Sequence, residues 1–247
     1  MAAAEFLPVS DEKISFEYKV KRFLAGSLLS PSEAHVYWNG TFSELEKHRL
    51  IKKGLPKSFQ ALVKQVDALP STNDALAHNL WFDQNYYLPD DILVKSDRMS
   101  MAHSVEVRPP FLDHRIVEFA AKLSAGLKIR GSKQKFVLRE LRKDILPASM
   151  LAGKKTGFDI PAHQWLRGPL QPMLREAIRY GVTEYGEVFE KSVVEWFLAR
   201  HLSRKANLGY HLWGLMILFQ WMKRWRIQAA TEAKPQTFLQ VTAGASI

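Results

Sequence analysis

The sequence has no cysteine in 247 residues. Disulfides, thiolate zinc sites, iron–sulfur clusters and cysteine nucleophiles are therefore excluded, and we expect a reducing, cytoplasmic compartment. No run of roughly 18 apolar residues occurs, which is the length a membrane-spanning helix needs. The N-terminus also lacks the basic start and unbroken apolar core of a signal peptide. We therefore expect no membrane partner.

The charge is unbalanced, with 35 lysines and arginines against 25 acidic residues, a formal net charge of +10. Hydrophobic residues make up 47% of the chain, which is typical of a folded protein and not of a disordered one. The excess charge suits nucleic acid, an anionic surface or a phosphate-bearing substrate. A basic helical nucleic-acid-binding module remains an alternative. Because the cations are scattered over many predicted helices, we do not expect a nucleic-acid partner.

Hydrophobic periodicity predicts a mainly α fold. Ser30-Pro31-Ser32-Glu33 and Ser43-Glu44-Leu45-Glu46 are typical helix starts, each with a serine cap and a glutamate three residues later. Sustained strand alternation is absent, and Val105–Arg108 comes nearest to it. We predict helices over 16–28, 58–66, 73–87, 90–104, 113–122, 133–145, 170–180, 192–202 and 207–227.

Charged residues gather in the segment from Tyr87 to Asp113. On a helix beginning at Asp90, the side chains of Asp91, Lys95 and Arg98 share one face. The simpler interpretation is a solvated face with an Asp–Lys pair four residues apart. However, Glu106 and Arg108 follow, alternating with valines just before two prolines that favour extended backbone. Charges in such a place are usually paired or bound to a ligand.

A second segment, 151–161, places Lys154 and Lys155 between two glycines. Such a loop can bring ammonium groups and backbone amides to a phosphate or carboxylate, although, taken alone, a surface turn is the simpler interpretation. Its spacing is not that of a P-loop. The histidines show no metal-ligand spacing, so we predict no metal site, and the Gly-x-Ser-x-Gly and Gly-x-Gly-x-x-Gly motifs are absent.

These segments resemble the synthetase domain of the glutamine-hydrolysing asparagine synthetase family. The similar stretches are 87–91 with Lys95, Asp97 and Arg98, then 101–108 and 110–115, then 154–158 with Pro161 and Trp165. Weaker similarity extends from about residue 15 to 225. The resemblance implies the helical C-terminal portion of an α/β ATP-pyrophosphatase-type domain, similar to adenine nucleotide α-hydrolases. We expect it to occupy residues 1–227, followed by a disordered tail, 228–247.

The resemblance also implies a reaction. Members activate the side-chain carboxylate of aspartate with ATP, release pyrophosphate from a β-aspartyl-adenylate intermediate, and let glutamine-derived ammonia attack. By position, Lys155 matches the lysine that contacts phosphate and the developing oxyanion, with Lys154 beside it. The implied catalytic residues are thus Lys155, Glu106 and Asp91, although the register of the acid at Asp91 is open. The implied substrate-binding residues are Lys95, Asp97, Arg98, Arg108 and Lys154. For Asp97, Arg98, Glu106 and Arg108, a buried ion-pair network is the other interpretation.

Three features of the family do not occur in this sequence. They are the Ser-Gly-Gly-x-Asp-Ser loop for ATP, the Gly-x-Gly-x-Asp-Glu segment for magnesium, and the cysteine of the glutaminase. We therefore expect an incomplete synthetase that needs an N-terminal portion and is inactive alone. A related ATP-dependent synthetase that forms other amides or a β-lactam is the alternative.

Overall fold

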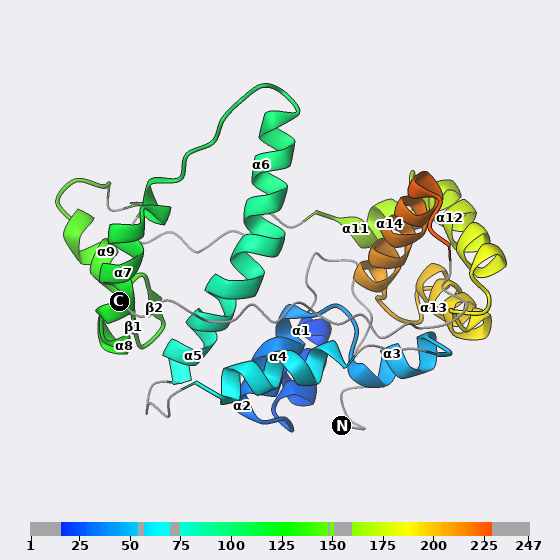
Figure 1. Ribbon diagram of the computed structural model, residues 1–247, viewed down its shortest axis with the longest axis horizontal. Helices are drawn as coiled ribbons and strands as arrows, with labels where there is room; N and C mark the ends of the chain where they lie inside the picture. The colour runs from blue at the N-terminus through cyan, green and yellow to red at the C-terminus, as the bar shows by residue number, and fades with distance from the viewer. Residues whose placement is uncertain (1–15, 54–56, 70–74, 148, 151–159, 229–247) are drawn as a thin grey trace. The chain divides into compact units, whose positions relative to one another are not determined.

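The computed structural model describes residues 16–53, 57–69, 75–147, 149–150 and 160–228. The chain divides into two compact units. Of the described residues, those within Val20–Gly40 and Ser58–Ile160 form unit 1, and those within Ala2–Lys19, Thr41–Lys57 and Pro161–Ile247 form unit 2. Both are built mainly from helices, as the sequence predicts (Figure 1).

Unit 1 begins with a small helical cluster. It contains most of α1 (Phe16–Gly26), together with α2 (Pro31–Asn39), α4 (Ser58–Asp67) and α5 (Ala75–Phe82). The predicted Ser30 cap is confirmed: its hydroxyl accepts a hydrogen bond from the Glu33 amide, and Glu33 accepts one from the Ser30 amide. A small core joins α2, α4 and α5, and its buried members are Val36, Val63, Val66 and Phe82.

A continuous helical rod then leaves this cluster. It consists of α5, the π-helix η2 (Asp83–Leu93) and α6 (Val94–Met101) (Figure 1). The predicted break at Leu88-Pro89 is wrong, because Pro89 lies inside η2. Proline lacks an amide hydrogen and clashes with the carbonyl four residues earlier, so an α-helix usually kinks there. The wider turns of a π-helix, with the Val94 amide bonded to the Pro89 carbonyl, let the rod continue.

The chain returns from the rod through extended backbone into a second group of short elements. These are the 3₁₀ turn η3 (Pro110–Leu112), α7 (His114–Lys122), α8 (Ala125–Lys128), β1 (Ile129–Arg130), β2 (Lys133–Gln134) and α9 (Phe136–Arg142). The antiparallel strands pair Ile129 with Gln134 and Arg130 with Lys133. The predicted helix 133–145 is too long at both ends, because Lys133 and Gln134 form β2 and α9 ends at Arg142. Gly131, in the hairpin turn before β2, takes a positive φ of 59°.

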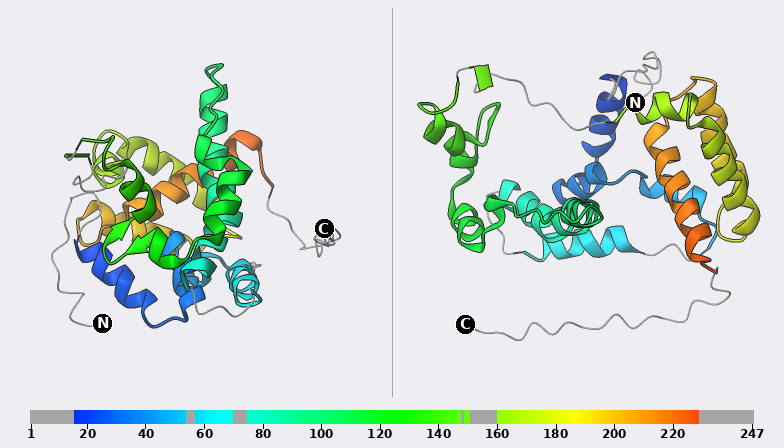
Figure 2. Two further views of the ribbon diagram at one scale, coloured as in Figure 1. Left: turned by 90° about the vertical axis from the view of Figure 1, so that its left-hand side faces the viewer. Right: turned by 90° about the horizontal axis from the view of Figure 1, so that it is seen from above.

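Unit 2 contains α3 (Glu44–Leu50) and four further described helices. They are α11 (Ala162–Arg167), α12 (Gln171–Glu184), α13 (Lys191–Leu202) and α14 (Gly209–Trp225). The views in Figure 2 show α12 and α14 side by side, and these two helices make the most extensive contact in the unit. The residues of the predicted helix 207–227 thus form a core helix.

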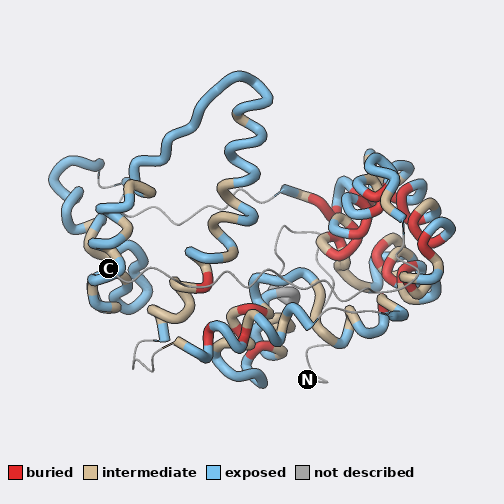
Figure 3. Tube along the Cα trace, viewed as in Figure 1, coloured by how far each residue is buried: buried red, intermediate tan, exposed pale blue. Residues whose placement is uncertain are grey.

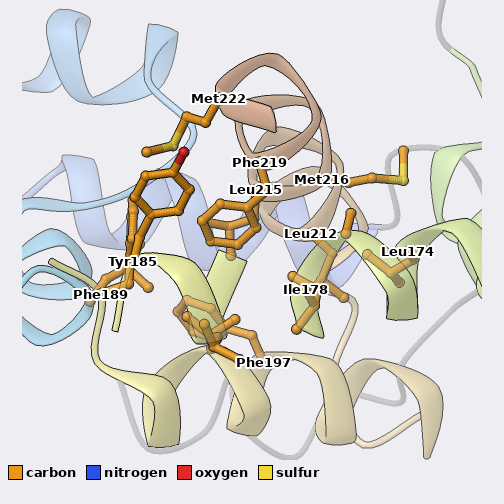
Figure 4. Packing of buried hydrophobic residues seen from close by; sticks show 14 of the residues in the cluster. Leu174, Ile178, Tyr185, Phe189, Phe197, Leu212, Leu215, Met216, Phe219 and Met222 are labelled. Atoms are coloured by element: carbon orange, nitrogen blue, oxygen red, sulfur yellow. The ribbon is translucent and has the colours of Figure 1, made fainter. Parts of the chain in front are cut away.

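The interior of unit 2 is a continuous apolar core. Phe219 on α14 is fully buried and packs edge-on against Phe189, with ring centroids 5.0 Å apart (Figure 4). Gly181 on α12 faces the Phe219 ring so closely that a β-carbon there would overlap it. The core continues along three helices through Leu174, Ile178, Val194, Phe197, Leu212, Leu215 and Met216.

Burial differs sharply between the units. Red, buried segments fill α11–α14 in Figure 3, whereas η2 to α9 are pale blue or tan. No residue from 83 to 147 is buried, and Phe111, Phe119 and Leu141 are each about two-thirds exposed. This part of unit 1 therefore presents apolar side chains without a core of its own. Among the described residues, no helix has both the length and the hydropathy of a membrane span.

A partly buried contact between Glu46 and His211 attaches α3 to α14 within unit 2. Glu46 completes the predicted Ser43 capping box, accepting hydrogen bonds from the Ser43 amide at 2.8 Å and hydroxyl at 2.7 Å. Its other oxygen lies 3.3 Å from Nε2 of His211, which is almost fully buried. Burial raises the pKa of Glu46, but the bonds from His211 and Ser43 outweigh it and lower that pKa to about 2.

Replacing Glu46 by glutamine is expected to lower the free energy of unfolding at pH 7 by about 1–2 kcal/mol, allowing for partial solvent screening. Because the folded pKa lies below the ordinary value of 4.5, the stabilisation is complete above that pH and disappears as the pH falls towards 2. Urea unfolding at pH 7 and pH 3 measures the difference. Glu176→Gln, which removes an exposed pair with Lys223, is the control. An equal cost of Glu46→Gln at both pH values would contradict the assignment.

Candidate functional site

The rod carries four of the charged residues that the sequence predicts for the site. Asp91 and Lys95 form the expected pair, with 3.6 Å between Oδ1 and Nζ. Both side chains are more than half exposed, so the pair is a weak surface contact. Arg98 is also exposed and forms no ion pair with a described residue. None of these three lines the groove described below, whereas Asp97 does.

The return segment begins with a sharp reversal at Ser104. This residue takes a positive φ of 58°, and the Val105 amide donates to the Ser100 carbonyl at 3.0 Å. In the extended backbone that follows, Arg108 Nε donates to Glu106 Oε1 at 2.8 Å. The side chains of Glu106 and Arg108 are 65% and 84% exposed. Within the described chain the pair is therefore not part of a buried network.

An open groove of about 990 Å³ separates the rod from the return segment. Its walls are mostly apolar, with three charged side chains, Asp97, Arg108 and Asp113, around them. Pro109 is extended, with φ −79° and ψ 114°, and Pro110 starts the 3₁₀ turn η3, whose residues also line the groove. The apolar lining consists of Leu88, Ile92, Leu93, Val107, Pro109, Pro110, Phe111 and Leu112.

Asp113 is a charged residue of the groove that the sequence does not predict as a site residue. It caps α7 by accepting from the Arg115 amide at 2.9 Å, and the Arg115 guanidinium binds both carboxylate oxygens at 2.9 and 2.7 Å. The side-chain bonds from Arg115 lower the pKa of Asp113 and keep it anionic. An aspartate directly before an amphipathic run is a typical cap, which is the signal that could have marked it.

The remaining predicted residues cannot be placed. Lys154 and Lys155 lie outside the described residues, so their roles stay predictions. Among the described residues no group of histidine, aspartate and glutamate side chains is arranged to hold a metal ion. The groove thus offers an apolar surface, two carboxylates and a guanidinium, which can bind a small molecule that carries both charges.

The chain belongs to the asparagine synthase family, whose model matches residues 9–225. It is 30% identical over 181 residues to asparagine synthetase [glutamine-hydrolyzing] 1 of Bacillus subtilis, covering 73% of this chain and 28% of that protein. A putative asparagine synthetase [glutamine-hydrolyzing] of Mycobacterium tuberculosis H37Rv is 34% identical over 149 residues, covering 60% and 22%.

Relatives of another name also match. Amidase chry2 of Gibberella zeae is 30% identical over 99 residues, covering 37% of this chain and 15% of that protein. The chain spans about a quarter of the length of the curated synthetases that it matches over most of its own length. No solved structure matches it.

Proposed function

We propose that this chain supplies the aspartate side of an ATP-dependent asparagine synthetase. The observation that carries the proposal is the groove, which gathers Asp97, Arg108 and Asp113 around one opening within the range of the family match. The Ser-Gly-Gly-x-Asp-Ser and Gly-x-Gly-x-Asp-Glu sequences are absent from these 247 residues, so ATP and magnesium would be bound by residues outside them.

Arg108 would bind the α-carboxylate of aspartate. Because its Nε is bonded to Glu106, the guanidinium is oriented while its two terminal nitrogens form no hydrogen bond with a described residue. These two donors match a carboxylate in a bidentate arrangement. Glu106 thus acts through Arg108 as a positioning residue, and Asp97 would accept from the substrate's α-ammonium group.

The reaction needs further groups for its developing charge. A side-chain oxygen of aspartate attacks the α-phosphorus of ATP and expels pyrophosphate, giving the acyl-adenylate. Ammonia then attacks the acyl carbon, loses a proton, and AMP departs with the former carboxylate oxygen. Fixed cations stabilise both the pyrophosphate and the tetrahedral oxyanion, and this is the role we propose for Lys155, with Lys154 beside it. Asp91 and Lys95 do not line the groove. They would change the electrostatic potential in the groove without touching the substrate.

AMP release tests the proposal. The 247-residue chain, given ATP, magnesium, aspartate and ammonia, is expected to form no AMP. Adding the complementary N-terminal part of the Bacillus subtilis relative as a separate polypeptide is expected to give aspartate-dependent AMP release. A pull-down between the two polypeptides separates failure to associate from failure of chemistry. AMP formation by the chain alone, or an associated complex without aspartate-dependent AMP, would overturn the proposal.

The apolar lining of the groove favours a second candidate, a related synthetase that forms an amide or β-lactam from a less polar acid. Aspartate by itself has little apolar surface with which to fill walls built from leucine, valine, proline and phenylalanine. The same AMP assay discriminates when aspartate is replaced by a panel of larger carboxylic acids. Faster AMP release with an apolar acid than with aspartate would favour this candidate.

A further inference from the structure

Much of the chain's positive charge lies in one small part of unit 1. Residues 122–144, which we call the basic module, contain eight lysines and arginines and two acidic residues, a net charge of +6 out of +10. The positive charge is therefore less evenly spread over the helices than we expect from the sequence. The cations are Lys122, Lys128, Arg130, Lys133, Lys135, Arg139, Arg142 and Lys143.

The basic module is a folded element with its own internal contacts. The Arg130 guanidinium lies 4.3 Å from the centroid of the Phe136 ring, which joins the hairpin to α9. Arg139 Nε donates to the Gln134 carbonyl at 3.1 Å. These contacts hold the hairpin and α9 together, so the cations occupy a defined surface and not a random coil.

Little of this charge is neutralised within the described chain. Lys143 lies 3.9 Å from Glu140, a long and exposed contact. Four other cations, Lys122, Lys133, Lys135 and Arg142, are exposed and form no ion pair with any described residue. The module therefore presents an uncompensated positive field that favours a polyanionic surface.

Exposed apolar side chains accompany the cations. Leu138 and Leu141 lie three residues apart on α9, and Arg142 follows Leu138 by four, so the three share a face. Leu141 is 68% exposed and Ile145, just beyond the helix, is 66% exposed. Exposed leucine and isoleucine beside lysine and arginine are typical of segments that lie in the interface of a lipid bilayer.

We propose that the basic module binds an anionic lipid surface. Clusters of four to eight lysines and arginines bind acidic headgroups, and Leu141 and Ile145 can enter the boundary of the acyl chains. A nucleic-acid strand would use the charge but gain little from these aliphatic side chains. It would instead need exposed aromatic rings for base stacking. The module's one aromatic residue, Phe136, is half-buried and covered by Arg130.

Vesicle co-sedimentation of the full chain tests the proposal. We expect binding to phosphatidylcholine vesicles that contain phosphatidylserine, weaker binding as salt is raised, and none to phosphatidylcholine alone. Lys133→Glu with Arg142→Glu is expected to weaken binding by about tenfold or more. Lys64→Glu with Lys205→Glu makes the same charge change at exposed positions outside the module and should have a much smaller effect. Circular dichroism checks folding, and Lys133→Gln with Lys135→Gln replaces the first pair if it fails to fold.

A second pair of variants separates lipid from nucleic acid. Leu141→Gln with Ile145→Gln is expected to weaken vesicle binding at constant charge, while any binding of a single-stranded RNA should be unaffected. Absence of vesicle binding by the unmodified chain would overturn the proposal. So would equal binding to neutral vesicles, unchanged binding by the charge-reversed pair, or tighter binding of the RNA than of the anionic vesicles.

Discussion

Replacing Phe219 by alanine is expected to lower the free energy of unfolding of unit 2 by about 3–5 kcal/mol. The ring projects from α14 and is fully buried against Gly181 of α12 and Phe189, so its loss removes apolar contacts and leaves a cavity. Gly181 touches the ring but cannot fill the space, because it has no side chain. Hydrogen exchange of the α12 and α14 amides measures the effect.

Phe119→Ala is the matched control for this prediction. Phe119 lies on α7 and is 64% exposed, so its removal should change stability by less than about 0.5 kcal/mol. Comparing the two variants tests whether a buried phenylalanine in unit 2 contributes more to stability than an exposed one in unit 1. Similar losses at Phe119 and Phe219 would show that the apolar surface of α7 is covered in solution.

Replacing Arg108 by methionine is expected to lower kcat/KM for aspartate by about 10²-fold in the reconstituted synthetase. Methionine keeps much of the apolar side chain but removes the bidentate donors proposed to bind the α-carboxylate. Glu106→Gln, which weakens the orientation of the guanidinium, should cost about tenfold. Steady-state kinetics of AMP release measures both changes.

The control for Arg108 is Arg224→Met, an exposed arginine in unit 2 that forms no described ion pair. The kcat/KM of the Arg224→Met variant should remain within about twofold of the value for the unmodified chain. Because Arg108 is exposed, Arg108→Met should also leave the thermal midpoint of the chain unchanged. If kcat/KM is unaffected by Arg108→Met, the groove is not the aspartate site.

Helix positions could largely be predicted from local sequence. The capping boxes at Ser30 and Ser43 are confirmed, and Asp113 begins a helix that ends at Lys122 as expected. These signals succeed because caps and amphipathic faces act within one or two turns. Residue 58 begins α4, also as predicted.

Two errors arise where non-local packing or unusual backbone decides the structure. Leu88-Pro89 carries the usual signal for a helix end, yet the π-helix η2 passes through it. The hairpin at 129–134 has strands of two residues, too short for any alternation to be recognised. In both cases the conformation that the chain adopts has no recognisable hydrophobic periodicity in the sequence.

The candidate site could be predicted only in its residues, not in its arrangement. Spacing indicates that Asp91 and Lys95 are neighbours, and they are. It could not indicate that Asp97 faces Arg108 across a groove, because that depends on the reversal at Ser104. Nor could it show whether Glu106 and Arg108 are buried, since exposure depends on what packs against them.

Oxygen transfer from aspartate to AMP tests the central claim most directly. The reconstituted synthetase is given aspartate labelled with ¹⁸O in its side-chain carboxylate, together with ATP and ammonia, and AMP is analysed by mass spectrometry. An acyl-adenylate requires one labelled oxygen in AMP for each asparagine formed. Labelled inorganic phosphate with ADP, or asparagine formed with unlabelled AMP, would contradict the account.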